Sequence, residues 1–278
     1  MPNAYVRLAD LRAEVQGQGA NRTNDDALMR AAERASRLID DEAQRHFYYA
    51  DAQTRYYPAI ARPEHVSSRE LWLPDDLLAV TTLKVDREGD GTYGLTLAAG
   101  TDYQLYPPNA APYLRVDLVS GGQLGAWPVA ARGVQIVGRF GYSADLAAAG
   151  TLAALIADGT TTTITLTAGH DVSPGDTLVI EAEQLDVRAL SAANEATVTR
   201  GVNGSTAAAH SNGVAVSRRR FPPAIEFACA AQASRMFRSV QTGYAERVAS
   251  PDTGGYAFSG LYPQIRDAIA PYRARLVA

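Results

Sequence analysis

Lysine and cysteine are nearly absent from this 278-residue chain. Cys229 is the single cysteine, so no disulfide can form within the chain and no cysteine-based metal site is available. Lys84 is the single lysine, and all other basic residues among the 26 are arginine. No apolar run approaches the roughly 18 residues that a membrane span needs. Residues 1–15 also lack the apolar centre of a secretory signal, so we expect a protein made in the cytosol.

The chain is acidic overall, with a net charge of −4, which argues against a nucleic-acid-binding footprint over the whole surface. The charge is unevenly distributed. Residues 150–217 carry seven acidic and two basic side chains, whereas residues 218–278 carry four acidic and nine basic ones. With 46% hydrophobic and 20% charged residues, the composition is typical of a globular protein with one large domain or two smaller ones.

Helical periodicity marks both ends of the chain. Apolar residues recur every three or four positions over residues 8–15 and 23–46, which predicts two amphipathic helices. A third helix is predicted over residues 222–240, where paired prolines suit a helix start. The last predicted helix begins near Pro263, and Pro271 should bend it.

Between these helices the sequence changes to short runs of Tyr, Val, Leu and Thr that are interrupted by Pro and Gly. Residues 48–142 therefore predict several short strands in a small sheet or sandwich. Residues 144–157 are rich in alanine and are interpreted as a linker. Residues 158–217 predict a second β unit without helices, whose turns are marked by Pro-Gly-Asp and Asn-Gly sequences.

The order of these elements predicts an α+β fold. Helices from both chain ends would pack with a small β-sheet region, because none of them can bury its apolar stripe alone. An inserted all-β domain would complete the molecule. The predicted boundaries are a discontinuous core of residues 1–149 and 219–278 and an inserted β domain of residues 150–218.

Residues 89–94 match the G-x-G-x-x-G pattern of dinucleotide-binding loops. That loop needs a helix directly after the glycines, because the helix N-terminus holds the pyrophosphate, and here a strand pattern follows. Asp90-Gly91 is instead a hairpin signal, so we predict a hairpin and no nucleotide binding. The stretch also resembles the start of a calcium-binding EF-hand loop. Leu97 stands where the bidentate glutamate belongs, so a solvated turn is favoured.

No catalytic constellation is evident in the sequence. The four histidines lie far apart and have no second ligand at metal-binding spacing. Cys229 falls on the apolar stripe of a helix, which favours a packing thiol over a nucleophile. The adjacent pairs Asp40-Asp41 and Asp75-Asp76 are interpreted as solvated, because neighbouring side chains point apart. The sequence predicts no enzyme activity, cofactor or metal, although residues from distant loops could still converge.

Two basic segments are candidates for partner contacts. Arg218, Arg219 and Arg220 form the one basic run, for which a solvated junction is favoured over contact with DNA or an acidic partner. The second segment is the last helix, which could be a positive arm used in assembly or could pack back on its own subunit. Its candidate contact residues are Arg266, Ile269, Tyr272, Arg273, Arg275 and Leu276.

The chain resembles the head–tail connector (adaptor) proteins of long-tailed bacteriophages in several successive segments. At the N-terminal end these are LADLRAEV, NDDALMRAAERASRLIDDEAQRHF, TRYYPA and ELWLPDDLLAVTTLKVD. At the C-terminal end they are PPAIEFACAAQASRMFRS and the segment from Pro263 to Arg273. The resemblance covers the chain except the insert and depends on the order of the segments, since each is a pattern of packing residues.

The insert is similar to a small β module of phage neck and tail proteins. The similarity is most recognisable in TRGVNGS at residues 199–205, followed by His210. We interpret Arg200 and His210 as structural residues that fix the long loop between strands.

The resemblance implies a structural protein of the virion neck, made in the host cytoplasm, and brings no catalytic residues or cofactor. The expected form is a ring, dodecameric like the portal above it. A head-closure or tail-completion protein would bind below, and DNA would pass through the lumen without sequence recognition. The alternatives are a virion hydrolase, which lacks a catalytic constellation, and another neck or tail protein, such as a tail-completion or glycan-binding module.

Overall fold

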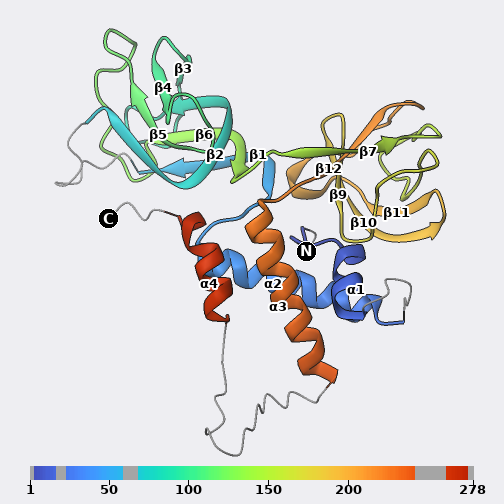
Figure 1. Cartoon of the computed structure of the whole chain (residues 1–278). Coiled ribbons are helices and arrows are strands. Elements are labelled where there is room, and N and C mark those ends of the chain that lie inside the picture. Colours follow the sequence, from blue (N-terminus) through green and yellow to red (C-terminus); the bar gives the residue numbers. More distant parts are fainter. Residues whose placement is uncertain (1–2, 17–22, 59–67, 242–260, 275–278) are drawn as a thin grey trace, which may run out of the picture. The chain divides into compact units, whose positions relative to one another are not determined.

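The computed structural model describes residues 3–16, 23–58, 68–241 and 261–274 (Figure 1). The chain divides into two compact units. The first, which we call the helix–barrel unit, comprises Met1–Gln44, Asp145–Val202 and Thr206–Arg273. The second, the central-sheet unit, comprises Arg45–Ala144, Asn203–Ser205 and Ala274–Ala278.

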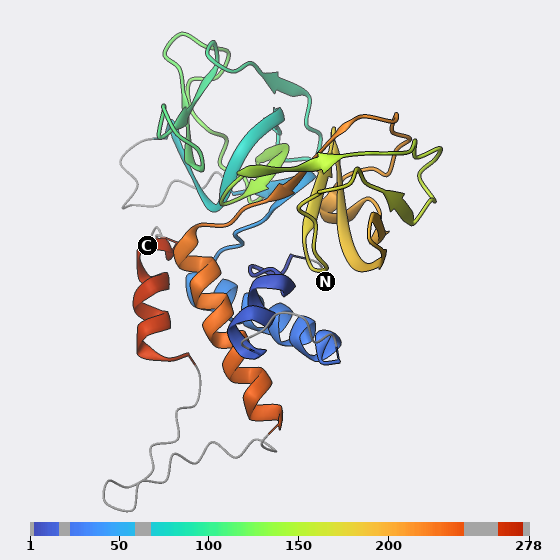
Figure 2. The same cartoon turned by 45° about the vertical axis from the view of Figure 1, so that its right-hand side comes forward.

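The helices of the helix–barrel unit come from both chain ends and lie side by side (Figures 1 and 2). They are α1 (Leu8–Gln16), α2 (Asp25–Ala43), α3 (Pro223–Gln241) and α4 (Pro263–Ile269). α2 packs along α3, and α1 and α4 each contact both. Alanines at the α2 contact, such as Ala35, which is fully buried, permit close approach of the helices. The first three predicted helices are therefore confirmed within a few residues.

The last helix is shorter than predicted. α4 ends at Ile269, and the chain continues as the 3₁₀ turn η2 (Ala270–Tyr272). Pro271 lies inside this turn, where its missing N–H and its ring are incompatible with another α-helical turn. The proline therefore ends the α-helix and does not bend it.

The second half of the helix–barrel unit is an antiparallel sheet in the order β7-β12-β9-β10-β11-β8. Its strands are β7 (Leu146–Thr151), β8 (Thr163–Thr165), β9 (Thr177–Ile180), β10 (Glu183–Ala192), β11 (Glu195–Thr199) and β12 (Ala215–Arg219). Leu152 and Leu166 form an antiparallel bridge just beyond the two edge strands, so the sheet closes into a small barrel. Buried side chains such as Leu178, Leu185 and Val216 fill its interior.

The interpretation of residues 144–157 as a linker is wrong. Residues 146–151 form β7, which pairs with β12 from Leu146↔Arg219 to Thr151↔Ala215. Leu152 and Ile156 then enter the barrel core, at 0% and 2% exposure. Alanine carries little propensity for a strand, and here the pairing partner and the barrel closure override that preference.

The central-sheet unit holds a second antiparallel sheet in the order β1-β6-β2-β5-β4, with β3 also paired to β2. Its strands are β1 (Tyr49–Tyr57), β2 (Glu70–Val85), β3 (Leu95–Leu97), β4 (Tyr103–Tyr106), β5 (Tyr113–Leu118) and β6 (Val134–Gly141). The segments ELWLP and VTTLKVD form one long strand, β2, although they read as two in sequence. Its pairing with β5 shifts register between Trp72 and Leu77, which accommodates Pro74 in the strand.

The predicted fold class is wrong. The described residues form a mostly β structure of two six-stranded antiparallel sheets with four short helices, and not helices packed with a small sheet. The error has a physical cause. The apolar periodicity of α2 and α3 is strong and local, whereas the strands are short and become recognisable as large sheets only through pairings between distant segments.

The prediction of a separately folding insert stays a prediction. The barrel has its own apolar core, made of side chains between residues 149 and 216. Polar contacts nevertheless connect it to the N-terminal segment. Arg7 Nη2 lies 2.7 Å from Asp171 Oδ1, and Asn3 Oδ1 accepts a 3.1 Å hydrogen bond from the Thr177 hydroxyl.

Candidate functional site

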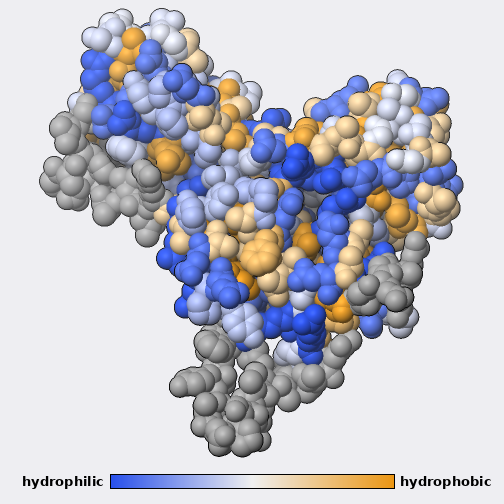
Figure 3. Space-filling view, in the orientation of Figure 1, coloured by the Kyte–Doolittle hydropathy of each residue, from blue (hydrophilic) through white to orange (hydrophobic). Residues whose placement is uncertain are grey.

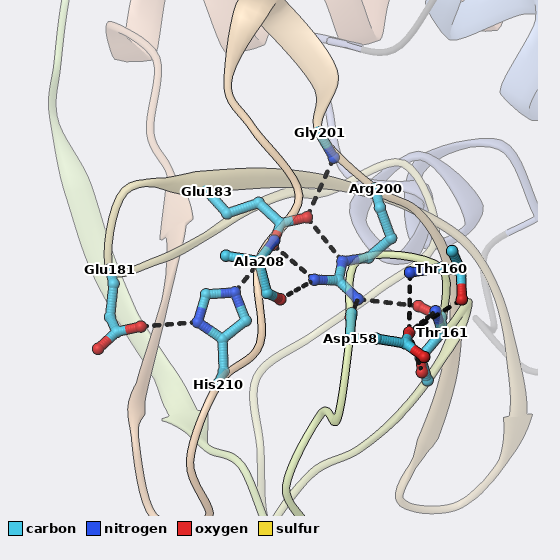
Figure 4. A network of polar contacts seen from close by, with 9 residues as sticks. All are labelled: Asp158, Thr160, Thr161, Glu181, Glu183, Arg200, Gly201, Ala208 and His210. Carbon is cyan, nitrogen blue, oxygen red and sulfur yellow. Dashed lines mark hydrogen bonds and ion pairs between the residues drawn. The ribbon is translucent and has the colours of Figure 1, made fainter.

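The most extensive buried polar cluster of the barrel surrounds Glu183, the first residue of β10 (Figure 4). Arg200 reaches it from the end of β11 and His210 from the segment before β12, while Glu181 lies in the β9–β10 turn. The side chains of Glu183, Arg200 and His210 are at most 4% exposed, and that of Glu181 is 60% exposed. We call these four residues the Glu183 network.

Arg200 and Glu183 form a two-pronged ion pair. Arg200 Nε and Nη2 donate to Glu183 Oε1 and Oε2, each over 2.6 Å. The remaining donors bind backbone carbonyls: Nη1 donates to Asp158 and Thr161, and Nη2 donates to Ala208. All five N–H groups of the guanidinium thus have an acceptor, which is the arrangement that a buried arginine requires.

Glu183 accepts three further hydrogen bonds. The backbone N–H groups of Gly201 and Ala208 donate to its two oxygens over 3.0 Å each, and His210 Nε2 lies 2.8 Å from Oε2. Burial by itself would raise the pKa of this carboxyl. The hydrogen bonds from Arg200, His210 and the two amides outweigh burial and lower its pKa to about 2, so Glu183 is ionised at neutral pH.

His210 connects Glu183 to the exposed Glu181. Its Nδ1 lies 2.7 Å from Glu181 Oε2, on the opposite side of the ring from Glu183. The His210 backbone also pairs with Ile156 in both directions, over 2.8 and 2.9 Å. Glu181 has φ +55°, in the left-handed region that residues other than glycine, asparagine and aspartate rarely adopt. The ring therefore bridges the β9–β10 turn and the segment before β12. The positive φ of Glu181 belongs to the two-residue turn between the paired residues Ile180 and Glu183.

Asp158 completes the cluster at the loop between β7 and β8. One of its carboxylate oxygens accepts hydrogen bonds from the amides and hydroxyls of Thr160 and Thr161, over 2.8 to 3.0 Å. These bonds lower the pKa of Asp158 to about 2. Its backbone carbonyl faces Arg200 (Figure 4). The guanidinium thereby holds the β7–β8 loop and the β11–β12 segment on the same side of the barrel.

The contacts confirm the interpretation of Arg200 and His210 as residues that fix the loop between strands. The Arg200 donors bind Glu183 and main-chain carbonyls, so none remains to bind or activate a substrate. Glu183 and Glu181 were not singled out from the sequence. The sequence did contain a signal for an ion pair in this domain. Residues 150–217 hold only two basic residues, so a buried acidic side chain in this range has few possible partners.

The basic run at residues 218–220 does not form one surface, because successive residues of β12 point to opposite sides. Arg218 Nε lies 3.1 Å from the exposed Asp171, and Arg219 is buried, with Nη2 2.6 Å from Gln184 Oε1. Arg220 is exposed. Arg220 is therefore the most solvent-exposed of the three candidates.

The last helix packs on the chain itself. Ile265 and Ile269 are buried, at 2% and 0% exposure, where α4 contacts α2 and α3. Arg273 forms an ion pair with Glu42 of α2, and Arg266 Nε lies 3.9 Å from the same carboxylate. Tyr272 is partly buried. Candidates Arg275 and Leu276 lie outside the described residues, and a role of this helix in assembly stays a prediction.

Three further sequence interpretations have clear outcomes. The hairpin at residues 89–94 is confirmed, because β2 pairs with β3 and the amides of Gly89 and Gly91 donate to Asp86, each over 2.8 Å. Cys229 is fully buried as a packing thiol, and burial raises its pKa to about 12.

The aspartate pairs are not solvated as predicted. Asp40 is 5% exposed and accepts a 2.5 Å hydrogen bond from Tyr5, and Asp76 is 8% exposed beside Arg45. Neighbouring side chains do point apart, and for that reason one member of each pair faces inward.

The surface is mixed in character. Hydrophilic residues predominate on the face shown in Figure 3, with apolar groups scattered among them. In the described ranges no cluster of three or more His, Cys, Asp or Glu side chains is arranged to hold a metal ion. Within the same ranges, no helix combines the length and apolarity needed to cross a membrane.

Comparison with protein-family models, curated proteins and solved structures found no match to this chain.

Proposed function

We propose that this chain is a structural virion protein, a head–tail connector (adaptor) subunit of a tailed bacteriophage. Copies of it would form a ring, expected to be dodecameric, between the portal and a head-closure or tail-completion protein. DNA would pass through the lumen of the ring without sequence recognition. In this role the protein needs no active site or cofactor.

The observation that carries the proposal is the meeting of the two chain ends. The helical segments that resemble connector proteins lie at residues 8–46 and 222–273, far apart in sequence, and the remaining resembling segments, TRYYPA and ELWLPDDLLAVTTLKVD, lie in the central-sheet unit. Their helices pack together in one unit, with α2 along α3 and α4 against both. Segments of one core are expected to be neighbours in space, so this packing supports the part of the proposal in which both chain ends build one core.

The chemistry of the Glu183 network supports a structural role over an enzymatic one. A catalytic carboxylate or histidine needs a free face toward a substrate. Glu183 and Arg200 are instead saturated by each other and by main-chain groups, and both are buried. Such a network holds loops in place, which suits a subunit that must present a constant surface to its neighbours.

Mass measurement on the full-length protein tests the proposal. The protein would be purified alone and mixed with the portal protein of the same phage, and native mass spectrometry would give the stoichiometry. A complex with equal numbers of both subunits supports the connector role. No association with portal, or an elongated trimer that binds glycans, would contradict it and favour another neck or tail protein.

A matched pair of charge variants makes the test specific. Arg220→Glu changes the exposed member of the basic run. Arg87→Glu makes the same change at an exposed residue of the central-sheet unit. If the basic run contacts an acidic partner, only Arg220→Glu should weaken the portal complex, by about tenfold or more. Equal binding by both variants would exclude the basic run from that contact. The connector role would then be tested by the stoichiometry of the portal complex alone.

A further inference from the structure

The helices and the barrel of the helix–barrel unit have few direct contacts with each other. In the described part of this unit, helices pack on helices and strands pair with strands, and no helix packs along a strand of the barrel. One close approach lies at Gly175, in the loop between β8 and β9, where an added Cβ would be 3.1 Å from Met29 Sδ of α2. The association of the helices with the barrel therefore depends on segments outside the regular elements.

Residues 3–7, which we call the N-terminal strap, precede α1 and belong to no helix or strand. Asn3, Ala4, Tyr5 and Val6 are nevertheless at most 7% exposed. Asn3 has φ +79°, in the left-handed region that asparagine tolerates better than most residues. An irregular segment is buried to this extent when its neighbours enclose it and pair with its polar groups. The strap has such neighbours on two sides.

On the helix side the strap is anchored through Tyr5, which is fully buried. Its hydroxyl donates to Asp40 Oδ1 over 2.5 Å, and its amide donates to Ser36 Oγ over 2.9 Å, both on α2. Arg37 Nη2, from the same helix, donates to the Asn3 carbonyl over 3.1 Å. Here hydrogen bonds accompany the burial of an aromatic ring, so separating the strap from α2 would cost both.

On the barrel side the contacts of the strap are polar. Arg7 Nε lies 3.3 Å from Asp176 Oδ1, and Arg7 Nη2 lies 2.7 Å from Asp171 Oδ1. The Thr177 hydroxyl donates to Asn3 Oδ1 over 3.1 Å. Water can replace these partners when the barrel moves away, whereas it cannot replace the packing of a buried ring. The side of the strap that faces the barrel is therefore the one that separates more easily.

The chain itself crosses from the barrel to the helices between Arg220 and Phe221. The Arg220 amide donates to the Asp145 carbonyl, next to β7, over 3.0 Å. The Phe221 ring packs on the Tyr5 ring, with the ring centroids 4.6 Å apart. Arg220 is thus held by the barrel and Phe221 by the strap, so the chain between these two residues is the pivot for any movement of the barrel.

We propose that residues 3–7 are a releasable strap that fixes the barrel to the helices. While Asn3 and Arg7 bind the barrel, the helices and the barrel move as one body. When these two residues lose their contacts, the strap stays on α2 through Tyr5 and the barrel turns about residues 220–221. This inference does not depend on the proposed virion role.

Release leaves the barrel intact. Asp171 keeps its ion pair with Arg218 of β12, with a distance of 3.1 Å, and Asp176 keeps the 2.8 Å hydrogen bond from the Ser173 amide. The apolar core of the barrel contains no residue of the strap. The two states therefore differ in the position of the barrel and not in its fold.

Nitrogen-15 relaxation NMR of the full-length protein tests the strap. In the wild type, amides of the barrel and amides of α2 and α3 should have one common rotational correlation time. The double variant Asn3→Gly/Arg7→Gln removes the contacts with the barrel, and glycine keeps the left-handed backbone at position 3. In this variant the barrel amides should have a correlation time different from that of α2 and α3, with the chemical shifts of both cores unchanged.

Trypsin cleavage after Arg220 measures the same opening, with mass spectrometry to identify the cut. The double variant should be cut there faster than the wild type by about tenfold or more, because each lost hydrogen bond to a charged group favours the open state by about that factor. Arg12→Gln is the matched control. Arg12 pairs with Asp25 between α1 and α2, and its side chain is 11% exposed against 22% for Arg7. This control should keep the wild-type cleavage rate and a single correlation time.

Several results would overturn the proposal. One is a common correlation time or an unchanged cleavage rate in the double variant. Another is a barrel that unfolds in the double variant, because the strap would then belong to the fold of the barrel and not to its placement. Equally fast cleavage of Arg12→Gln would show a general loosening of the helices. Separate correlation times in the wild type would show that the strap does not fix the barrel.

Discussion

The carboxylate of Glu183 and the guanidinium of Arg200 face each other inside the barrel, with both N–O distances at 2.6 Å. Burying two charges costs free energy that their attraction recovers only when every remaining donor and acceptor is satisfied. Here the amides of Gly201 and Ala208 and the carbonyls of Asp158 and Thr161 provide those partners. The pair is therefore the anchor for loops that contribute few apolar side chains of their own.

Removing one partner of this pair should destabilise the protein strongly. Glu183→Gln leaves Arg200 charged, buried and unpaired, and we expect a loss of about 3–5 kcal/mol in the free energy of unfolding. Urea denaturation followed by circular dichroism measures it. Glu195→Gln, at an exposed position, should change stability by less than about 0.5 kcal/mol. Similar losses in both variants would show that the ion pair has no special role.

The low pKa of Glu183 predicts a contribution to acid stability. Its folded-state pKa of about 2 lies below the unfolded value of about 4.3. The unfolded chain therefore binds the proton first as the pH falls, and the stabilisation is lost between about pH 4.3 and pH 2. Melting temperatures of wild type and Glu183→Gln should differ most above pH 4.5 and converge toward pH 2. A constant difference over this range would contradict the assignment.

Asp186 should have the opposite pH dependence. Burial raises its pKa to about 6, against the attraction of Arg188, and Glu33 raises it further. Because the folded-state pKa exceeds the unfolded one, this group lowers stability as the pH rises from about 4 to 6. Asp186→Asn should therefore stabilise the protein at pH 7, on the order of 1–3 kcal/mol. Chemical denaturation at pH 4 and pH 7 measures it, with the exposed Asp267→Asn as a control that should show no such gain.

The barrel should fold without the rest of the chain. All members of its apolar core lie between residues 149 and 216, and β7 and β12 pair with each other at its two ends. A fragment of residues 144–221 should give a cooperative thermal transition and a dispersed amide NMR spectrum. An unfolded fragment would show that contacts such as Arg7 with Asp171 and Asp176 are essential for folding.

The last helix should contribute to the stability of the subunit. Ile269→Ala removes a fully buried side chain where α4 meets α2 and α3, and should cost about 2–4 kcal/mol. Asp267→Ala, on the exposed side of the same helix, should cost less than about 0.5 kcal/mol. A negligible loss for Ile269→Ala, measured by urea denaturation, would instead favour the assembly-arm interpretation of this segment.

The sequence predicts local structure correctly where a pattern and its physical cause lie within a few residues of each other. The stripe of Leu28, Ala31, Ala35, Leu38 and Ile39 predicts α2, and all of these side chains except Leu38, which is 36% exposed, are buried. Asp90-Gly91 predicts a turn, and Gly91 adopts φ +88°. By contrast, residues 144–157 lack any local feature of a strand and were misread, because β7 exists only through its pairing with β12.

By itself, the sequence determined the first three helices, the Asp90-Gly91 turn and the buried state of Cys229, since these depend on periodicity, backbone conformation and side-chain polarity over one or two turns of chain. Only the tertiary structure decided that the protein is mostly β, and that Glu183 meets Arg200 and His210. Both outcomes depend on pairings between residues that are distant in sequence. Sheet registers and buried charge pairs depend on the free energy of the whole packed unit. A local sequence pattern therefore cannot predict them.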